Sequence, residues 1–147
     1  MYWMILPLKK YFQFSGRSRR KEYWMFALLF WILFFVAGII DTMLGFGTVN
    51  TGTATDPYNF NWNVHNGPVM IVLSLAFFIP HLAVSVRRLH DTNRSGWWLL
   101  ILLLPLIGMI TMFVFLCLDG TVGPNRFGAD PKAGEPGHPP LEAVPAR

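Results

Sequence analysis

The chain has 147 residues, of which 53% are hydrophobic and only 14% are charged. Soluble domains usually carry about one quarter charged residues, and a domain of this size cannot bury so much apolar surface. The composition therefore excludes an ordinary soluble domain and indicates an integral membrane protein. The net charge of +4 does not favour a nucleic-acid partner, because the cations stand in short blocks beside apolar runs and none lies between residues 22 and 86.

Residues 1–23 are predicted to form a basic segment at the membrane surface. Ile5, Leu8 and Phe12 fall on one helical face, which favours a short interfacial helix, although Pro7 limits it to a turn or two. A frayed terminus is the alternative. Ser18 is expected to cap the helix that follows. Six cations precede the first apolar run: Lys9, Lys10, Arg17, Arg19, Arg20 and Lys21.

The apolar runs define an all-α transmembrane domain over residues 24–118, with spans predicted at about 24–40, 68–86 and 97–118. About 20 apolar residues cross a bilayer as a helix, so each run is near the required length. In the third run Pro105 and Gly108 are expected to bend the helix. A re-entrant hairpin that turns at Pro105 is the alternative to a third crossing.

Two ionisable residues lie at or within the first two spans. Asp41 ends the first span and is expected at the outer interface, where water is available. His81 follows Pro80, which should kink the second span and free the carbonyl of Ala76. A neutral His81 could bond that carbonyl, and this structural role is favoured over proton transfer or transport.

The distribution of Lys and Arg predicts the orientation in the membrane. Six cations precede the first span, none lies in the 41–67 loop, and three lie in the turn at 87–96. The positive-inside rule then places the N-terminus in the cytoplasm. The polar turn motif at 119–131 and the tail at 132–147, predicted to be disordered, would lie outside after a third crossing and inside after a hairpin.

The polar segments supply the candidate binding residues. Arg, His, Asp and Asn within the 87–96 turn can form a hydrogen-bond network or hold a phosphate headgroup, and Asp91 can accept from neighbouring arginines. An acid–base pair of His90 and Asp91 is disfavoured, because adjacent side chains seldom face each other. No catalytic residue, metal site or cofactor is indicated. The candidates for binding lipid or a partner are Arg17, Arg19, Arg20, Lys21, Arg87, Arg88, His90, Asp91, Arg94 and Trp97.

Three motifs in order, FSGRSRRKEYW, RRLHDTNRSGWW and GPNRFGADP, resemble those of a family of small bacterial inner-membrane proteins. This is the family called domain of unknown function 805, or YhaH/YhaI-like. The resemblance covers about residues 8–131 and implies a bacterial plasma-membrane location, but no activity. If the polar motifs at 16–24, 87–97 and 123–131 act together, they should share one membrane face, which a hairpin at Pro105 would allow.

Three functions remain as hypotheses. The leading one is a non-enzymatic membrane protein whose basic cytoplasmic face binds anionic lipid or a membrane partner, with a homo-oligomer as one form of partner. The alternative is a subunit of a channel or transporter, in which the helices broken at Pro80 and Pro105 line a path. An enzyme that acts on lipid through the His90–Asp91 turn is the third and least favoured.

Overall fold

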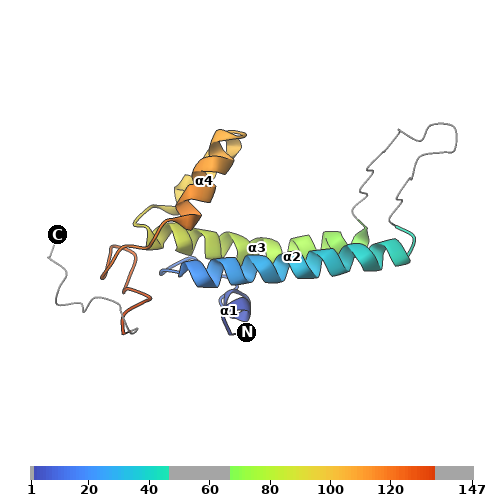
Figure 1. The fold of residues 1–147 in the computed structure, drawn as a ribbon, viewed down its shortest axis with the longest axis horizontal. Helices are drawn as coiled ribbons and strands as arrows, with labels where there is room; N and C mark the ends of the chain where they lie inside the picture. The colour runs from blue at the N-terminus through green and yellow to red at the C-terminus, as the bar shows by residue number, and fades with distance from the viewer. Residues whose placement is uncertain (1, 47–66, 135–147) are drawn as a thin grey trace. The chain divides into compact units, whose positions relative to one another are not determined.

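The computed structural model describes residues 2–46 and 67–134, and within these ranges the regular elements are all helical (Figure 1). The predicted all-α class is thereby confirmed. Residues 47–66 and 135–147 lie outside the described residues, and with them most of the predicted loop at 41–67 and of the predicted tail at 132–147. The elements are the α-helices α1 (Tyr2–Lys9), α2 (Arg20–Met43), α3 (Pro68–Asp91) and α4 (Ile107–Cys117), and the 3₁₀ helix η1 (Gly96–Leu103).

Helices α2 and α3 are long and apolar enough to cross a membrane. Each has 24 residues, which corresponds to about 36 Å of α-helix against about 30 Å of hydrocarbon. Both helices therefore extend beyond the apolar runs and include polar residues at their ends. Helix α2 begins at Arg20, and the Ser18 hydroxyl has no hydrogen-bond partner in the described chain. The prediction that Ser18 caps this helix was wrong.

The chain divides into two compact units, and the smaller comprises Leu28–Phe78. Within it the later part of α2 packs against the first part of α3. The rings of Phe30 and Phe77 lie 5.7 Å apart, and Ala37 and Met70 are buried. Small side chains on α2 allow the helices to approach closely, as is typical of helices that pack in lipid.

Asp41 closes this smaller unit. Its carboxylate accepts hydrogen bonds from the backbone N–H groups of Val69 (3.1 Å) and Met70 (2.9 Å), and the residue is 1% exposed. The first amides of a helix have no partner within the helix, so Asp41 caps α3 from the end of the preceding helix. These amides replace water as donors to Asp41, and its expected location at the outer interface stays a prediction.

The larger unit contains Met1–Ala27 and Ile79–Arg147. Here the first turns of α2 lie against the last turns of α3, with Phe26, Ala83 and Val84 fully buried. Helix α1 forms two turns that include Pro7, which is buried with Leu6. His81 lies near the rings of Tyr23 (5.8 Å) and Phe26 (6.1 Å). The predicted bond from His81 to the carbonyl of Ala76 stays a prediction.

The third apolar run does not form one continuous helix. Helices η1 and α4 fold back on each other and are joined by residues 104–106 (Figure 1). Ile107 N–H donates to Pro105 C=O at 2.8 Å around Leu106, whose φ of 64° and ψ of −64° define a strained γ-turn. A Cβ on Gly108 would lie 1.9 Å from the carbonyl oxygen of Ile101, so only glycine permits this approach.

Neither arm of this hairpin is long enough to cross a bilayer. Helix η1 has 8 residues and α4 has 11. At about 2.0 Å and 1.5 Å per residue, each arm extends about 16 Å, roughly half the hydrocarbon thickness. Its outward side chains are nonetheless large and apolar: Leu103, Leu106, Ile107, Ile110 and Phe113 are all more than half exposed.

Candidate functional site

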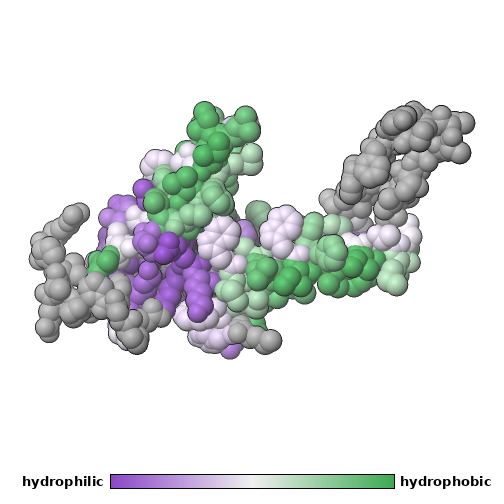
Figure 2. Space-filling view, in the orientation of Figure 1, coloured by the Kyte–Doolittle hydropathy of each residue, from purple (hydrophilic) through white to green (hydrophobic). Residues whose placement is uncertain are grey.

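The three polar motifs meet at one place in the larger unit, where the start of α2, the end of α3 and the segment after α4 come together. Figure 2 shows hydrophilic side chains gathered at this place and a hydrophobic surface over the η1–α4 hairpin. The hairpin is what allows this arrangement, because it returns residues 119–131 to the end of α3 from which η1 departs. We call this region the polar end of the larger unit.

A cluster of Arg17, Asp91 and Arg88 lies at the centre of the polar end. Arg17 Nε donates to Asp91 Oδ1 at 2.9 Å, and Arg88 Nη1 donates to Asp91 Oδ2 at 2.5 Å. The three side chains are no more than 2% exposed. Asp91 ends α3, where a negative charge opposes the helix dipole, so the two guanidinium groups supply the compensation that it needs.

Arg17 also joins the first motif to the third. Its Nη1 donates to the carbonyl of Gly123 at 2.6 Å, and its Nη2 donates to the carbonyl of Thr121 at 2.5 Å. Thr121 N–H in turn donates to the carbonyl of Asp91 at 2.8 Å. A Cβ on Gly120 would lie 2.1 Å from Asp91 Oδ2, so a glycine at this position lets the chain pass over the carboxylate.

Arginines also satisfy the C-terminal end of α4. Arg88 donates to the carbonyls of Leu116 (3.2 Å) and Leu118, and Arg20 Nη1 donates to the carbonyl of Cys117 at 3.0 Å. The last carbonyls of a helix have no partner within it and attract cations. Side chains from α2 and α3 therefore hold the returning arm of the hairpin by its end.

A second buried ion pair lies between α2 and α3. Arg87 Nη1 is 3.1 Å from Glu22 Oε1, and both side chains are at most 4% exposed. The guanidinium nitrogens nevertheless make no well-directed hydrogen bond among the described residues. The two groups are thus close enough for an ion pair but are not oriented for a hydrogen bond. We interpret the contact as an ion pair without a hydrogen bond, because opposite charges attract at this distance in any orientation.

Most residues of the motif at 92–96 have a structural role in the turn between α3 and η1. Arg94 N–H donates to Leu89 C=O at 2.9 Å and Asn93 N–H to His90 C=O at 3.0 Å, while Asn93 has a φ of 59°. This is a Schellman motif with asparagine in the left-handed position. Ser95 then caps η1. Asn93 and Ser95 therefore have structural roles, whereas the side chain of Arg94 makes only a long contact in the turn, 3.5 Å from its Nη1 to the carbonyl of Thr92.

Residues 125–128 form a tight turn that docks on the end of α3. Asn125 Nδ2 donates to the carbonyl of His90 at 2.9 Å, and Asn125 Oδ1 accepts from Phe127 N–H at 2.9 Å. The rings of Phe127 and His90 are stacked at 3.9 Å with an angle of 4°. His90 Nδ1 lies 3.2 Å from the carbonyl of Gly16. His90 and Asp91 thus have separate partners among the described residues.

A small pocket of about 110 Å³ remains beside the cluster, lined by Arg17, Asp91, residues 119–122, Asp130 and Lys132. Its carboxylates are already engaged. Asp119 pairs with Arg20 and Lys132, and Asp130 accepts from the backbone N–H groups of Gly123 and Lys132. The pocket is therefore a gap within a saturated network.

The predicted binding residues separate into two groups by burial. Arg17, Arg87, Arg88 and Asp91 are buried, so their side chains are not part of a surface that could contact a headgroup. The others lie wholly or partly at the surface: Arg19, Arg20, Lys21, His90, Arg94 and Trp97. The sequence interpretation missed the roles of Asn125 and Thr121, although the polar composition of the third motif pointed to the segment.

Comparison with known proteins places the chain in a family. The family described as "Protein of unknown function (DUF805)" matches residues 11–129. "Inner membrane protein YhaH" of Escherichia coli strain K12 is 44% identical over 132 residues, which cover 90% of this chain and 98% of that protein. "Inner membrane protein YhaI" of the same strain is 42% identical over 134 residues, covering 91% and 98%. No solved structure matches. The two relatives just described are inner membrane proteins. The chain therefore belongs to the DUF805 family.

Proposed function

We propose that this protein is a non-enzymatic, multi-pass inner-membrane protein whose polar end lies in the cytoplasm and binds anionic lipid. The observation that carries the proposal is that a hydrophobic hairpin leaves directly from a polar end with cations at its surface. That arrangement suits a protein whose polar end sits at the level of the headgroups. Lys21 is exposed, and the Arg19 guanidinium lies 5.1 Å from the ring of Trp3.

The contacts within the polar end support a two-crossing topology. Arg17, at the start of the chain, is hydrogen-bonded to carbonyls of residues 121 and 123, near its end. These contacts support a location of both segments on the same side of the membrane. In this topology α2 and α3 cross, and the hairpin enters the bilayer and returns. Arg126 and Lys132 join the nine cations already assigned to the cytoplasmic side, in agreement with the positive-inside rule.

Aromatic side chains support the placement at the interface. Trp97 is 76% exposed at the start of η1, and Trp24 is 40% exposed near the start of α2. Tryptophan is enriched where hydrocarbon meets headgroups. Both residues lie at the boundary between the polar end and the apolar helices, so the cations beside them would face the phosphate layer.

Lipid preference tests the proposed function. The full chain is reconstituted in phosphatidylcholine, and its tryptophan fluorescence is quenched with brominated phosphatidylglycerol or brominated phosphatidylcholine. We expect stronger quenching by phosphatidylglycerol, with a preference that falls at high salt. The triple variant Lys9→Gln, Lys10→Gln, Lys21→Gln should lower the preference by about tenfold at low salt, since each cation adds up to about 1 kcal/mol. Equal quenching of the wild type by both lipids would refute lipid binding.

The topology has its own test. A reporter that is active only in the cytoplasm is fused after Arg147, and a second reporter that is active only in the periplasm is fused at the same point. We expect the cytoplasmic reporter to be active. Activity of the periplasmic fusion would mean a third crossing and would contradict the proposed topology.

A further inference from the structure

Two arginines at the polar end, Arg94 and Arg126, have no ionic partner among the described residues. Arg17 and Arg88 pair with Asp91, Arg87 pairs with Glu22, and Arg20 pairs with Asp119. No carboxylate of the described chain lies within ion-pair distance of Arg94 or Arg126. Because the four arginines named above pair with carboxylates, two guanidinium groups without such a partner indicate a surface that can bind an anion from outside the chain.

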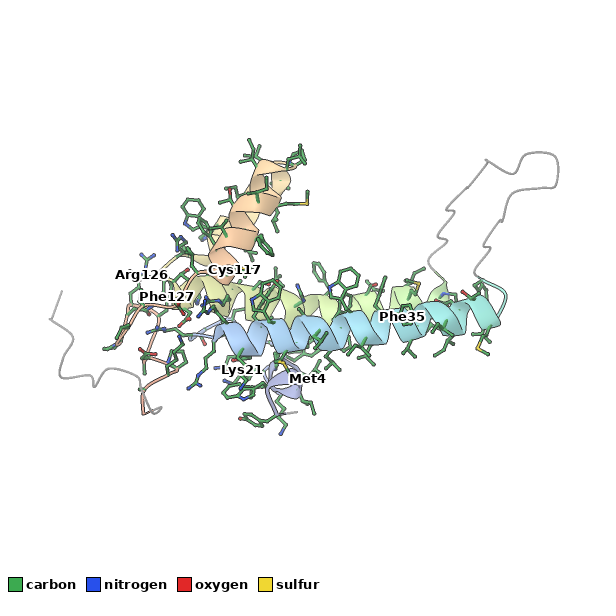
Figure 3. All side chains as sticks on the ribbon, viewed as in Figure 1. Met4, Lys21, Phe35, Cys117, Arg126 and Phe127 are labelled. Carbon is green, nitrogen blue, oxygen red and sulfur yellow. The ribbon has the colours of Figure 1, made fainter. Side chains whose placement is uncertain are left out.

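The two arginines are held on the same turn. Arg126 Nη2 donates to the carbonyl of Asn93 at 3.1 Å, and Arg94 Nη1 is 3.5 Å from the carbonyl of Thr92. These carbonyls belong to neighbouring residues of the corner between α3 and η1. Figure 3 labels Arg126 and Phe127 near Cys117, the last residue of α4, at the base of the hairpin.

Aromatic rings orient both guanidinium groups. The Arg94 guanidinium carbon lies 4.1 Å from the centre of the Phe115 ring, and that of Arg126 lies 4.7 Å from the centre of the Phe127 ring. The Phe127 ring is itself stacked on His90. Contact with an aromatic face restricts a guanidinium group and leaves its in-plane N–H groups available. Each arginine has five N–H donors and uses one of them within the part of the chain that the structure describes, so the others are available to a ligand there.

We infer that Arg94 and Arg126 form a binding site for a phosphate group at the base of the hairpin. Planar guanidinium groups match phosphate oxygens and can bind them with paired hydrogen bonds. Trp98, whose ring meets that of Phe115 edge-on at 5.3 Å, supplies apolar surface beside the site. The inference rests on the proposed function in placing this site at headgroup level, where the phosphate is that of a phospholipid. Free phosphate has the same chemistry, and the experiment separates the two sources.

The test measures lipid binding to the full chain in detergent by native mass spectrometry, at an ionic strength that screens diffuse surface charge. We expect the double variant Arg94→Gln, Arg126→Gln to raise the Kd of the first bound phosphatidylglycerol by about tenfold or more, because charge-assisted hydrogen bonds are lost. Arg94→Lys with Arg126→Lys keeps the charge but loses the planar donors, so its Kd should lie between those of the wild type and the glutamine variant. The control Lys132→Gln removes a cation that already pairs with Asp119 and should change this Kd by less than about twofold.

Inorganic phosphate is the competing probe. If it does not displace the lipid, the site takes a headgroup; if it displaces the lipid and also binds alone in an arginine-dependent way, the site takes free phosphate. An unchanged first Kd in the glutamine variant, with helical circular dichroism and thermal unfolding like those of the wild type, would overturn the inference while leaving the proposed function intact. A wild type with no preference for phosphatidylglycerol that still binds inorganic phosphate through the two arginines would instead refute the proposed function alone.

Discussion

Removing the negative charge of Asp91 should be among the most damaging single changes at the polar end. The substitution Asp91→Asn keeps the size and one acceptor oxygen but leaves Arg17 and Arg88 without a carboxylate. The carboxylate now accepts one charge-assisted hydrogen bond from each arginine, at 2.9 and 2.5 Å. It also lies under Gly120, so the segment after α4 depends on its position.

The expected cost follows from burial. The side chain of Asp91 is 2% exposed, and those of its partners are 0% and 1% exposed. Removing one member of a buried ion pair typically costs about 3–5 kcal/mol, because the charge left behind has neither water nor a partner. Asparagine can still accept one hydrogen bond, so we expect the lower end of that range, about 3 kcal/mol.

The measurement is reversible unfolding in mixed micelles with increasing dodecyl sulfate, followed by helical circular dichroism. Asp119→Asn is the matched control, because Asp119 pairs with Arg20 and Lys132 but its side chain is 65% exposed. A pair that is this exposed contributes about 0–1 kcal/mol. In the double variant Arg17→Gln, Asp91→Asn the combined loss should be smaller than the sum of the single losses, since both act on one contact. If Asp91→Asn and Asp119→Asn lowered the free energy of unfolding equally, the buried cluster would not be what holds the polar end together.

Two further substitutions test the hairpin and the capped end of α3. Gly108→Ala should lower the free energy of unfolding by about 2 kcal/mol in the same assay, because its Cβ would overlap the backbone of Ile101. In the control Gly38→Ala the new Cβ meets only Met70 at 3.8 Å, so this change should be neutral or stabilising by up to about 1 kcal/mol. Equal effects of the two substitutions would contradict the close approach of η1 and α4. Asp41→Ala should lower the free energy of unfolding by about 1–2 kcal/mol and speed hydrogen exchange at the amides of Val69 and Met70. Asp41→Asn keeps an acceptor oxygen and should preserve most of the cap. Unchanged exchange in the alanine variant would show that the cap is not needed.

The two classes of arginine show why burial could not be read from the chain alone. Arg87, Arg88 and Arg94 lie within eight positions and all counted equally as cytoplasmic charge. The structure buries the first two, which pair with Glu22 and Asp91, and leaves Arg94 on an aromatic ring at the surface. Their partners come from distant segments: Arg17 and Asp91 are 74 residues apart in sequence, and Arg17 and Gly123 are 106 apart. No local pattern reports such a pairing.

The sequence by itself determined the features that depend on composition and on near neighbours. Apolar runs of crossing length specified α2 and α3, because a helix is the structure that satisfies its own backbone in lipid. The turn at residues 92–96 also follows locally, from an asparagine that accepts the left-handed conformation and a serine that caps the next helix.

Only the tertiary structure decided whether the run at 97–118 forms one continuous helix or folds back on itself. Its composition fits either outcome, and its 22 residues are enough for one helix. The return is selected by contacts at its far end, where Arg20 and Arg88 bind the last carbonyls of α4 and Arg17 holds the segment beyond it. Hydropathy could not reveal this outcome, because it measures the preference of the run for lipid and not the hydrogen bonds and ion pairs that form at its two ends.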